Sequence, residues 1–137
     1  MVEISKSVDL GVDAATVWAV IGDFNSLADW HPAVSQSRLE DDGNLRRLVL
    51  ADGGKIVERL ENRDDAARRY SYSIAQAPLP VTDYLATLGV CETGDGCRVT
   101  WSGRFTVSGT SEAEAAAVIG GIYEAGLTAL QKRFGSQ

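Results

Sequence analysis

One long helical pattern near the C-terminus constrains the fold of this chain more than any other feature. Apolar residues recur at helical spacing from Ala115 to Phe134, a run of about 20 residues, which corresponds to roughly 30 Å of helix. Ser111 and Glu114 form a capping box just before it, which is typical of a helix N-terminus. Short alternating segments fill most of the preceding chain. A sheet that buries its apolar face against one long helix has to curve around that helix.

Alternation of apolar and polar residues predicts seven strands ahead of the long helix. The first covers Val2–Leu10, and two short helices follow it, at Ala14–Ile21 and Asn25–Asp29. The other six strands are predicted at Val34–Glu40, Leu45–Leu50, Lys55–Asn62, Arg68–Gln76, Thr82–Glu92 and Arg98–Ser108. Their connections are short, so neighbouring strands should pair antiparallel. We therefore predict a single α+β domain over residues 1–137, with a curved seven-stranded antiparallel sheet wrapped around the long C-terminal helix.

Charge and composition exclude several classes of function. The formal net charge of −6 argues against nucleic acid, because phosphate binding needs a basic surface. No segment approaches the roughly 20 apolar residues of a membrane-spanning helix, and no signal peptide is visible, so we expect a cytoplasmic protein. One histidine and two separated cysteines are too few for a metal site, and phosphate-binding and dinucleotide motifs are absent. We expect no cofactor, and a monomer or a weak homodimer.

The last hairpin fixes which side chains of its strands face the core. A four-residue turn over residues 93–96 places Leu88 opposite Trp101, and Tyr84 opposite Phe105. In the same register Cys91 points outward while Cys97 points inward. An intramolecular disulfide between the two cysteines is therefore not expected.

The same argument, applied to the middle hairpins, places a band of polar groups on the concave face. It predicts Leu48 opposite Glu58, Glu58 opposite Tyr72, and Tyr72 opposite Tyr84, with Arg46 diagonal to Glu58. A carboxylate on an apolar face is costly unless it is paired or protonated. Arg46 and Glu58 are therefore either a buried pair that fixes strand register or a polar anchor inside an apolar pocket.

Four segments of the chain resemble a known superfamily: Ala14–Phe24, Trp30–Pro32, Pro78–Val81 and Gly54–Leu60. Together with the order of elements, they resemble the START / Bet v 1-like (SRPBCC) superfamily, and more closely its polyketide cyclase/dehydrase branch. The resemblance implies the helix-grip fold, with an internal cavity for a hydrophobic or aromatic small molecule. It does not imply one activity, because this superfamily includes carriers, receptors and enzymes.

The candidate site combines this cavity with the inward faces derived above. The residues predicted to contact ligand are Trp30, His31, Leu48, Tyr72, Tyr84, Leu88, Trp101, Phe105, Ile122 and Gly126. Gly126 in the long helix has two interpretations, namely close packing of the helix against its neighbours or space left for a ligand. His31 is the only histidine, a residue type that titrates near neutral pH, and it is interpreted mainly as a wall or mouth residue.

Three functions are consistent with these features. The preferred one is binding or transport of a hydrophobic or aromatic small molecule in the cavity. The alternative is a cyclase, dehydratase or lyase in which Glu58 is the general base, and Arg46 or Tyr72 stabilises a developing oxyanion. The third is a partner-binding protein whose cavity is filled by its own side chains. Whether the protein is an enzyme stays open at this point.

Overall fold

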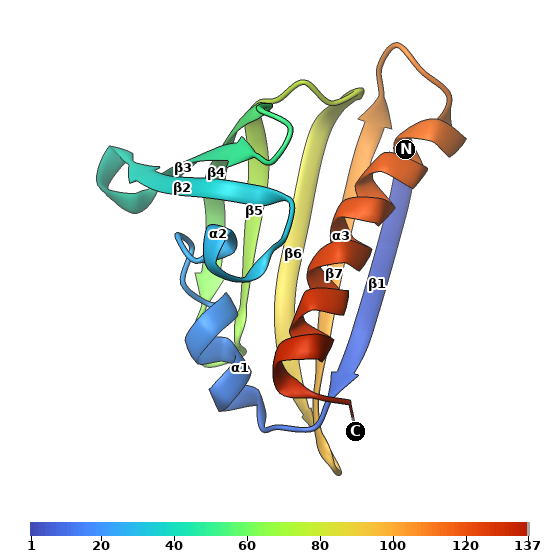
Figure 1. Cartoon of the computed structure of the whole chain (residues 1–137). Helices are drawn as coiled ribbons and strands as arrows, with labels where there is room; N and C mark the ends of the chain where they lie inside the picture. Colours follow the sequence, from blue (N-terminus) through green and yellow to red (C-terminus); the bar gives the residue numbers. More distant parts are fainter. Residues whose placement is uncertain (137) are drawn as a thin grey trace.

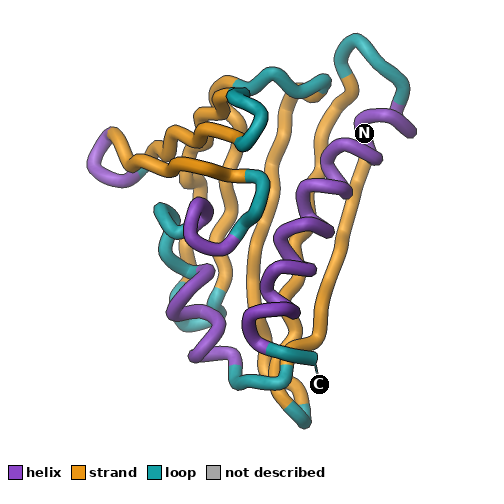
Figure 2. Tube along the Cα trace, viewed as in Figure 1, coloured by secondary structure: helices purple, strands orange, loops and turns teal. Residues whose placement is uncertain are grey.

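The computed structural model describes residues 1–136 and shows one antiparallel sheet with three α-helices on the same side of it (Figures 1 and 2). The strands follow the order β1-β7-β6-β5-β4-β3-β2, so β1 joins the end of a meander formed by the other six. The elements are β1 (Val2–Leu10), α1 (Ala14–Ile21), α2 (Leu27–Trp30), β2 (Val34–Glu40), a 3-10 turn (Asp41–Gly43), β3 (Leu45–Leu50), β4 (Lys55–Asp64), β5 (Arg69–Gln76), β6 (Val81–Thr93), β7 (Gly96–Val107) and α3 (Glu112–Phe134).

The predicted architecture is confirmed, and the predicted boundaries lie within two residues of the observed ones. In Figure 1, α3 lies along β7 and β1, while α1 and α2 lie beside it on the other half of the concave face. The Ser111 hydroxyl accepts a hydrogen bond from the Glu114 amide (3.1 Å), and Asp13 caps α1 through the Thr16 amide (2.9 Å). One core cluster joins all three helices to the sheet.

The β6–β7 hairpin has the register that its sequence predicts. Leu88 pairs with Trp101, and the rings of Tyr84 and Phe105 stack with centroids 6.1 Å apart, although a bulge in β6 interrupts the ladder there. Cys91 is exposed and Cys97 is buried. The two cysteines therefore point to opposite sides of the hairpin, as the register predicts.

The predicted register of the β3–β4 hairpin is wrong by two residues. Leu48 pairs with Ile56 instead of Glu58, which places Arg46 directly opposite Glu58 instead of diagonal to it. The turn begins one residue earlier than predicted, because the Leu50 amide donates to the Gly54 carbonyl. A shift of two residues leaves every side chain on its predicted face.

The next two hairpins are also shifted by two residues. Glu58 pairs with Ile74 instead of Tyr72, and Tyr72 pairs with Ala86 instead of Tyr84. Two bulges interrupt the β4–β5 ladder, one on each strand, and the β5–β6 ladder ends at the pair Ser73–Leu85, well before the connecting loop. The rings of Tyr72 and Tyr84 still lie 6.1 Å apart, so the predicted band of side chains on the concave face is present.

Candidate functional site

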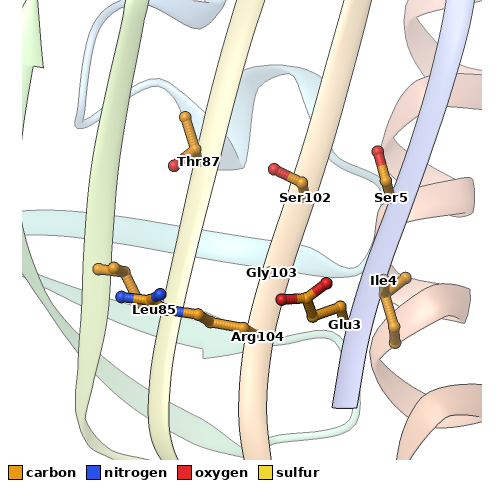
Figure 3. A pocket seen from close by; sticks show the side chains of 8 residues that line it. All are labelled: Glu3, Ile4, Ser5, Leu85, Thr87, Ser102, Gly103 and Arg104. Atoms are coloured by element: carbon orange, nitrogen blue, oxygen red, sulfur yellow. The ribbon is translucent and has the colours of Figure 1, made fainter. Parts of the chain in front are cut away.

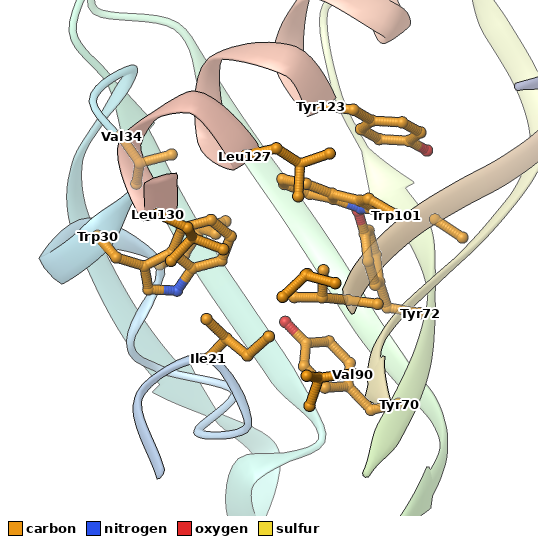
Figure 4. Packing of buried hydrophobic residues seen from close by; sticks show 14 of the residues in the cluster. Ile21, Trp30, Val34, Tyr70, Tyr72, Val90, Trp101, Tyr123, Leu127 and Leu130 are labelled. Carbon is orange, nitrogen blue, oxygen red and sulfur yellow. The ribbon is translucent and has the colours of Figure 1, made fainter. Parts of the chain in front are cut away.

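A mostly apolar cavity of about 70 Å³ lies between α2, α3 and the concave face of the sheet, largely shielded from solvent. Figure 4 shows the packing beside it, with the Trp101 indole next to the Tyr72 hydroxyl, and Tyr123 and Leu127 coming from α3. A water molecule occupies about 30 Å³, so the cavity has room for about two. Its walls are formed by Leu27, His31, Ala33, Val34, Leu48, Leu50, Ile56, Glu58, Tyr72, Ile74, Leu79, Tyr84, Trp101, Ile119 and Ile122.

The structure brings seven of the predicted site residues to the wall of this cavity: His31, Leu48, Glu58, Tyr72, Tyr84, Trp101 and Ile122. The other predicted residues are buried nearby but do not line it, and these are Arg46, Trp30, Leu88, Phe105 and Gly126. The wall also contains eight residues that were not predicted from the sequence as site residues: Leu27, Ala33, Val34, Leu50, Ile56, Ile74, Leu79 and Ile119. Ile119 was within reach of prediction, since it lies one helical turn from Ile122 on α3.

A buried ion pair forms one end of the site. Arg46 Nε donates to Glu58 Oε1 at 2.8 Å, and the two side chains are 0% and 8% exposed. Arg46 Nη1 donates to the Phe24 carbonyl (3.0 Å) and to the Tyr70 hydroxyl (3.1 Å). The guanidinium carbon also lies 4.1 Å from the centroid of the Phe24 ring and 4.8 Å from that of Tyr72. Arg46 is thus held on several sides by aromatic faces and hydrogen bonds.

The polar groups on the cavity wall have unused hydrogen-bonding capacity. Burial raises the pKa of Glu58, and the Arg46 guanidinium only partly offsets this. Its Oε2 has no hydrogen-bond partner among residues 1–136. Tyr72 accepts a hydrogen bond from Trp101 Nε1 at 2.9 Å, and its own hydroxyl proton has no acceptor within the described chain. Burial raises the pKa of Tyr72 well above its usual value, so that proton is retained at neutral pH.

Both ring nitrogens of His31 are already hydrogen-bonded. Its Nδ1 accepts from the Ala33 amide (3.1 Å), which leaves Nε2–H to donate to the Ile122 carbonyl on α3 (2.8 Å). The ring also meets Trp101 edge-on, with centroids 5.8 Å apart. Burial lowers the pKa of His31, with the hydrogen bond to Ile122 acting in the opposite direction. The residue therefore joins α2 to α3 as a neutral ring.

Lowering the pH from 7.5 to 5.5 is expected to reduce the free energy of unfolding by about 1 kcal/mol through His31. The unfolded chain gains a proton below its ordinary histidine pKa of about 6.5, whereas the folded chain does not until lower pH. Urea unfolding at the two pH values measures the difference. His31→Gln, which can still donate to Ile122, should lack most of this pH dependence. An equal pH dependence in both proteins would contradict the assignment.

Five lining residues are only half-buried, namely Ala33, Leu50, Ile74, Leu79 and Ile122. They come from five different segments and mark the side of the cavity that is nearest to solvent. Leu50 precedes the 51–54 turn, and Leu79 lies in the 77–80 loop at the same end of the sheet (Figure 1). A molecule entering the cavity would pass between these apolar side chains.

A larger hollow of about 530 Å³ lies elsewhere, on the outer face of β1, β7 and β6 (Figure 3). It is open and shallow, and its lining is mostly polar and charged: Glu3, Ile4, Ser5, Leu85, Thr87, Ser102, Gly103 and Arg104. None of the predicted site residues is among them. Because the hollow is open to solvent and would cover little of a ligand's surface, it is a poorer candidate for a small-molecule site than the internal cavity.

No helix within residues 1–136 has the length and apolar character needed to cross a bilayer. Among the same residues, no three histidine, cysteine, aspartate or glutamate side chains gather closely enough to hold a metal ion.

A family model described as polyketide cyclase / dehydrase and lipid transport matches residues 1–135. The search among curated proteins finds no match. Among solved structures, the protein XoxI from Bacillus cereus is 43% identical, with a TM-score of 0.96 over 98% of this chain and 96% of that one.

Two more distant structures share the fold. One is a START superfamily protein from Mycobacterium smegmatis, at 17% identity and a TM-score of 0.78 over 96% of each chain. The other is the Zhui aromatase/cyclase from Streptomyces sp. R1128, at 18% identity and a TM-score of 0.80 over 96% of this chain and 92% of that one. The family match confirms the predicted resemblance to the polyketide cyclase/dehydrase branch, and these two structures confirm the predicted fold.

Proposed function

Because the chain belongs to the polyketide cyclase / dehydrase and lipid transport family, we propose that it binds a small, mostly apolar molecule in the cavity between α3 and the sheet. The observation that carries this proposal is the composition of the cavity wall. Aliphatic and aromatic side chains form nearly all of it, and Glu58 and Tyr72 add polar groups with unused hydrogen-bonding capacity. Apolar walls with a few placed polar groups are the usual composition of small-molecule sites.

The size of the cavity adds a requirement. Small-molecule pockets usually enclose about 300–1,000 Å³, whereas this one encloses about 70 Å³. A ligand larger than a few atoms therefore needs the half-buried residues to move apart. Leu50 and Leu79 adjoin loops instead of lying mid-strand, so their displacement breaks few hydrogen bonds of the sheet.

Filling the cavity from its outer side should abolish binding. Ala33→Leu adds three carbon atoms at the wall and leaves the Ala33 amide free to bond His31. We expect 2-naphthol to bind the wild-type protein at one site and the variant at least about tenfold more weakly, a difference of about 1.4 kcal/mol. Titration calorimetry measures both dissociation constants.

The matched control is Ala75→Leu, which adds the same atoms to an exposed position of β5. Its dissociation constant should equal that of the wild type. Absence of saturable binding to the wild type, or equal affinity for Ala33→Leu, would contradict the cavity as the binding site.

A catalytic role is the second candidate, favoured by the position of Glu58. Its raised pKa and its unbonded Oε2 on the cavity wall suit a general base. In this version Glu58 removes a proton next to a ligand carbonyl, and the Tyr72 hydroxyl donates to the oxygen on which charge develops. Deuterium exchange at that carbon of a bound ketone, followed by mass spectrometry, tests the step. Exchange no faster than in buffer would rule out the catalytic step, and binding would remain as the proposed function.

A further inference from the structure

We propose that the ligand presents a neutral hydroxyl group to the Glu58–Tyr72 side of the cavity, and that carboxylates are excluded. This inference rests on the binding function proposed above and specifies its ligand class. Glu58 and Tyr72 are diagonal neighbours on adjacent strands and face the same side of the sheet, because Glu58 pairs with Ile74 and Leu60 with Tyr72.

The two side chains offer complementary hydrogen bonds. Glu58 Oε1 is occupied by Arg46 at 2.8 Å, so Oε2 remains as an acceptor. The Tyr72 oxygen already accepts from Trp101 Nε1, so its hydroxyl proton remains as a donor. A hydroxyl group both donates and accepts, and one such group can therefore satisfy both partners. A purely apolar ligand would leave both unsatisfied after displacing water from the cavity.

A second donor lies close to this pair. The hydroxyls of Tyr84 and Tyr123 bond each other, which uses only one of their two protons. The Tyr84 ring lies on the cavity wall, 6.1 Å from that of Tyr72. Besides the carboxylate, the polar groups here are protonated phenols, which suit an uncharged oxygen on the ligand.

An anionic ligand has no accessible cation in this site. No lysine or arginine of residues 1–136 lines the cavity. Arg46 is fully buried and does not line the cavity; its Nε and Nη1 bond Glu58, Phe24 and Tyr70, and its Nη2 is unpartnered but buried away from the wall. A carboxylate entering from the cavity would lose its hydration beside the unbonded oxygen of Glu58, and no cation on the wall would compensate for that loss.

A cationic ligand is disfavoured for a related reason. The charge of Glu58 is already compensated by Arg46 at 2.8 Å, so an ammonium group would lose its hydration without gaining a full counter-charge. The free hydroxyl protons of the tyrosines do not help, because an ammonium group has only N–H donors and needs acceptors. Uncharged ligands with a hydroxyl group remain as the class that the wall accommodates.

Three ring-matched probes test the headgroup directly: 2-naphthol, 2-methylnaphthalene and 2-naphthoate. At pH 7 we expect the naphthol to bind at least about tenfold more tightly than the methyl compound, since two hydrogen bonds are gained. The naphthoate should bind at least about a hundredfold more weakly than the naphthol. Titration calorimetry gives all three constants on the intact protein.

Tyr72→Phe should reduce the ratio of naphthol to methylnaphthalene affinity by about fivefold, whereas Ser71→Ala should leave it unchanged. Ser71 is the matched control because its hydroxyl lies on the same strand but bonds Thr87 on the outer face, away from the cavity. The ratio is insensitive to a general loss of stability, since both probes are affected alike.

The outcomes separate the two proposals. Equal binding of naphthol and methylnaphthalene, naphthoate binding within tenfold of naphthol, or an unchanged ratio in Tyr72→Phe would overturn the headgroup assignment. Cavity binding itself would survive these results, provided that Ala33→Leu still blocks the neutral probes. Failure of both neutral probes to bind the wild type would overturn the binding function as well.

Discussion

Replacing Glu58 with glutamine is expected to lower the free energy of unfolding by about 3–5 kcal/mol. Arg46 is fully buried, and without the carboxylate at 2.8 Å its charge has no counter-ion in the core. Urea unfolding of the wild type and the variant measures the loss. The double variant Arg46→Met/Glu58→Leu should recover most of it, because both buried charges are then absent.

The control is a pair of similar geometry at the surface. Arg98 donates to both carboxylate oxygens of Asp9, at 2.7 and 3.1 Å, but both side chains are exposed. Asp9→Asn should therefore cost less than about 1 kcal/mol. A similar cost for Asp9→Asn and Glu58→Gln, or a double variant less stable than Glu58→Gln, would contradict the role assigned to the buried pair.

A valine at position 126 should lower the free energy of unfolding by about 3 kcal/mol. A Cβ atom placed on Gly126 would lie 2.8 Å from His31 Cδ2, 2.8 Å from Trp101 Cζ3 and 3.0 Å from Trp30 Cζ3. These are packed rings that cannot move aside without disturbing the core. Of the two interpretations of Gly126, these short contacts favour close packing of the helix against its neighbours over free space for a ligand.

Gly121 on the same helix provides the matched control. A Cβ atom at Gly121 meets no heavy atom within 4 Å, and the residue is exposed. Gly121→Val should change stability by less than about 0.5 kcal/mol, since valine is at least as favourable as glycine in a helix. Equal effects at both positions in thermal or urea unfolding would show that helix propensity, not packing against α2 and β7, governs Gly126.

The architecture was predictable because its causes are local. Alternation set the strands, and the Ser111 cap set the start of α3. Strand register was harder, since the positions of the bulges between β4 and β5 depend on how the whole sheet curves. The side chains of Arg46, Glu58 and Tyr72 kept their predicted faces because the register at each of them shifted by two residues. For that reason Arg46 and Glu58 were predicted on the same face and are found in contact.

The candidate site was only partly predictable. A strand pattern tells which residues point inward, but it does not tell which of those residues contact a cavity and which pack elsewhere in the core. Leu88 and Phe105 are buried as expected but do not line the cavity. The residues on the outer side of the cavity, such as Ala33 and Leu79, come from loops that carry no periodic signal. The hydrogen bond from His31 to the Ile122 carbonyl joins segments distant in the chain and has no sequence signature.

The central claim is that small molecules bind in the cavity beside Trp101, and indole ¹⁵N–¹H NMR spectra test it most directly. Trp101 Nε1 donates to Tyr72 at the cavity wall, whereas Trp18 Nε1 donates to Asp65 at the surface, 3.3 Å away. On titration with 2-naphthol, we predict a saturable shift of the Trp101 indole signal with the Trp18 signal unchanged. An unmoved Trp101 signal at saturating 2-naphthol, with shifts confined to backbone amides of the outer face such as Ser102 and Arg104, would contradict the account.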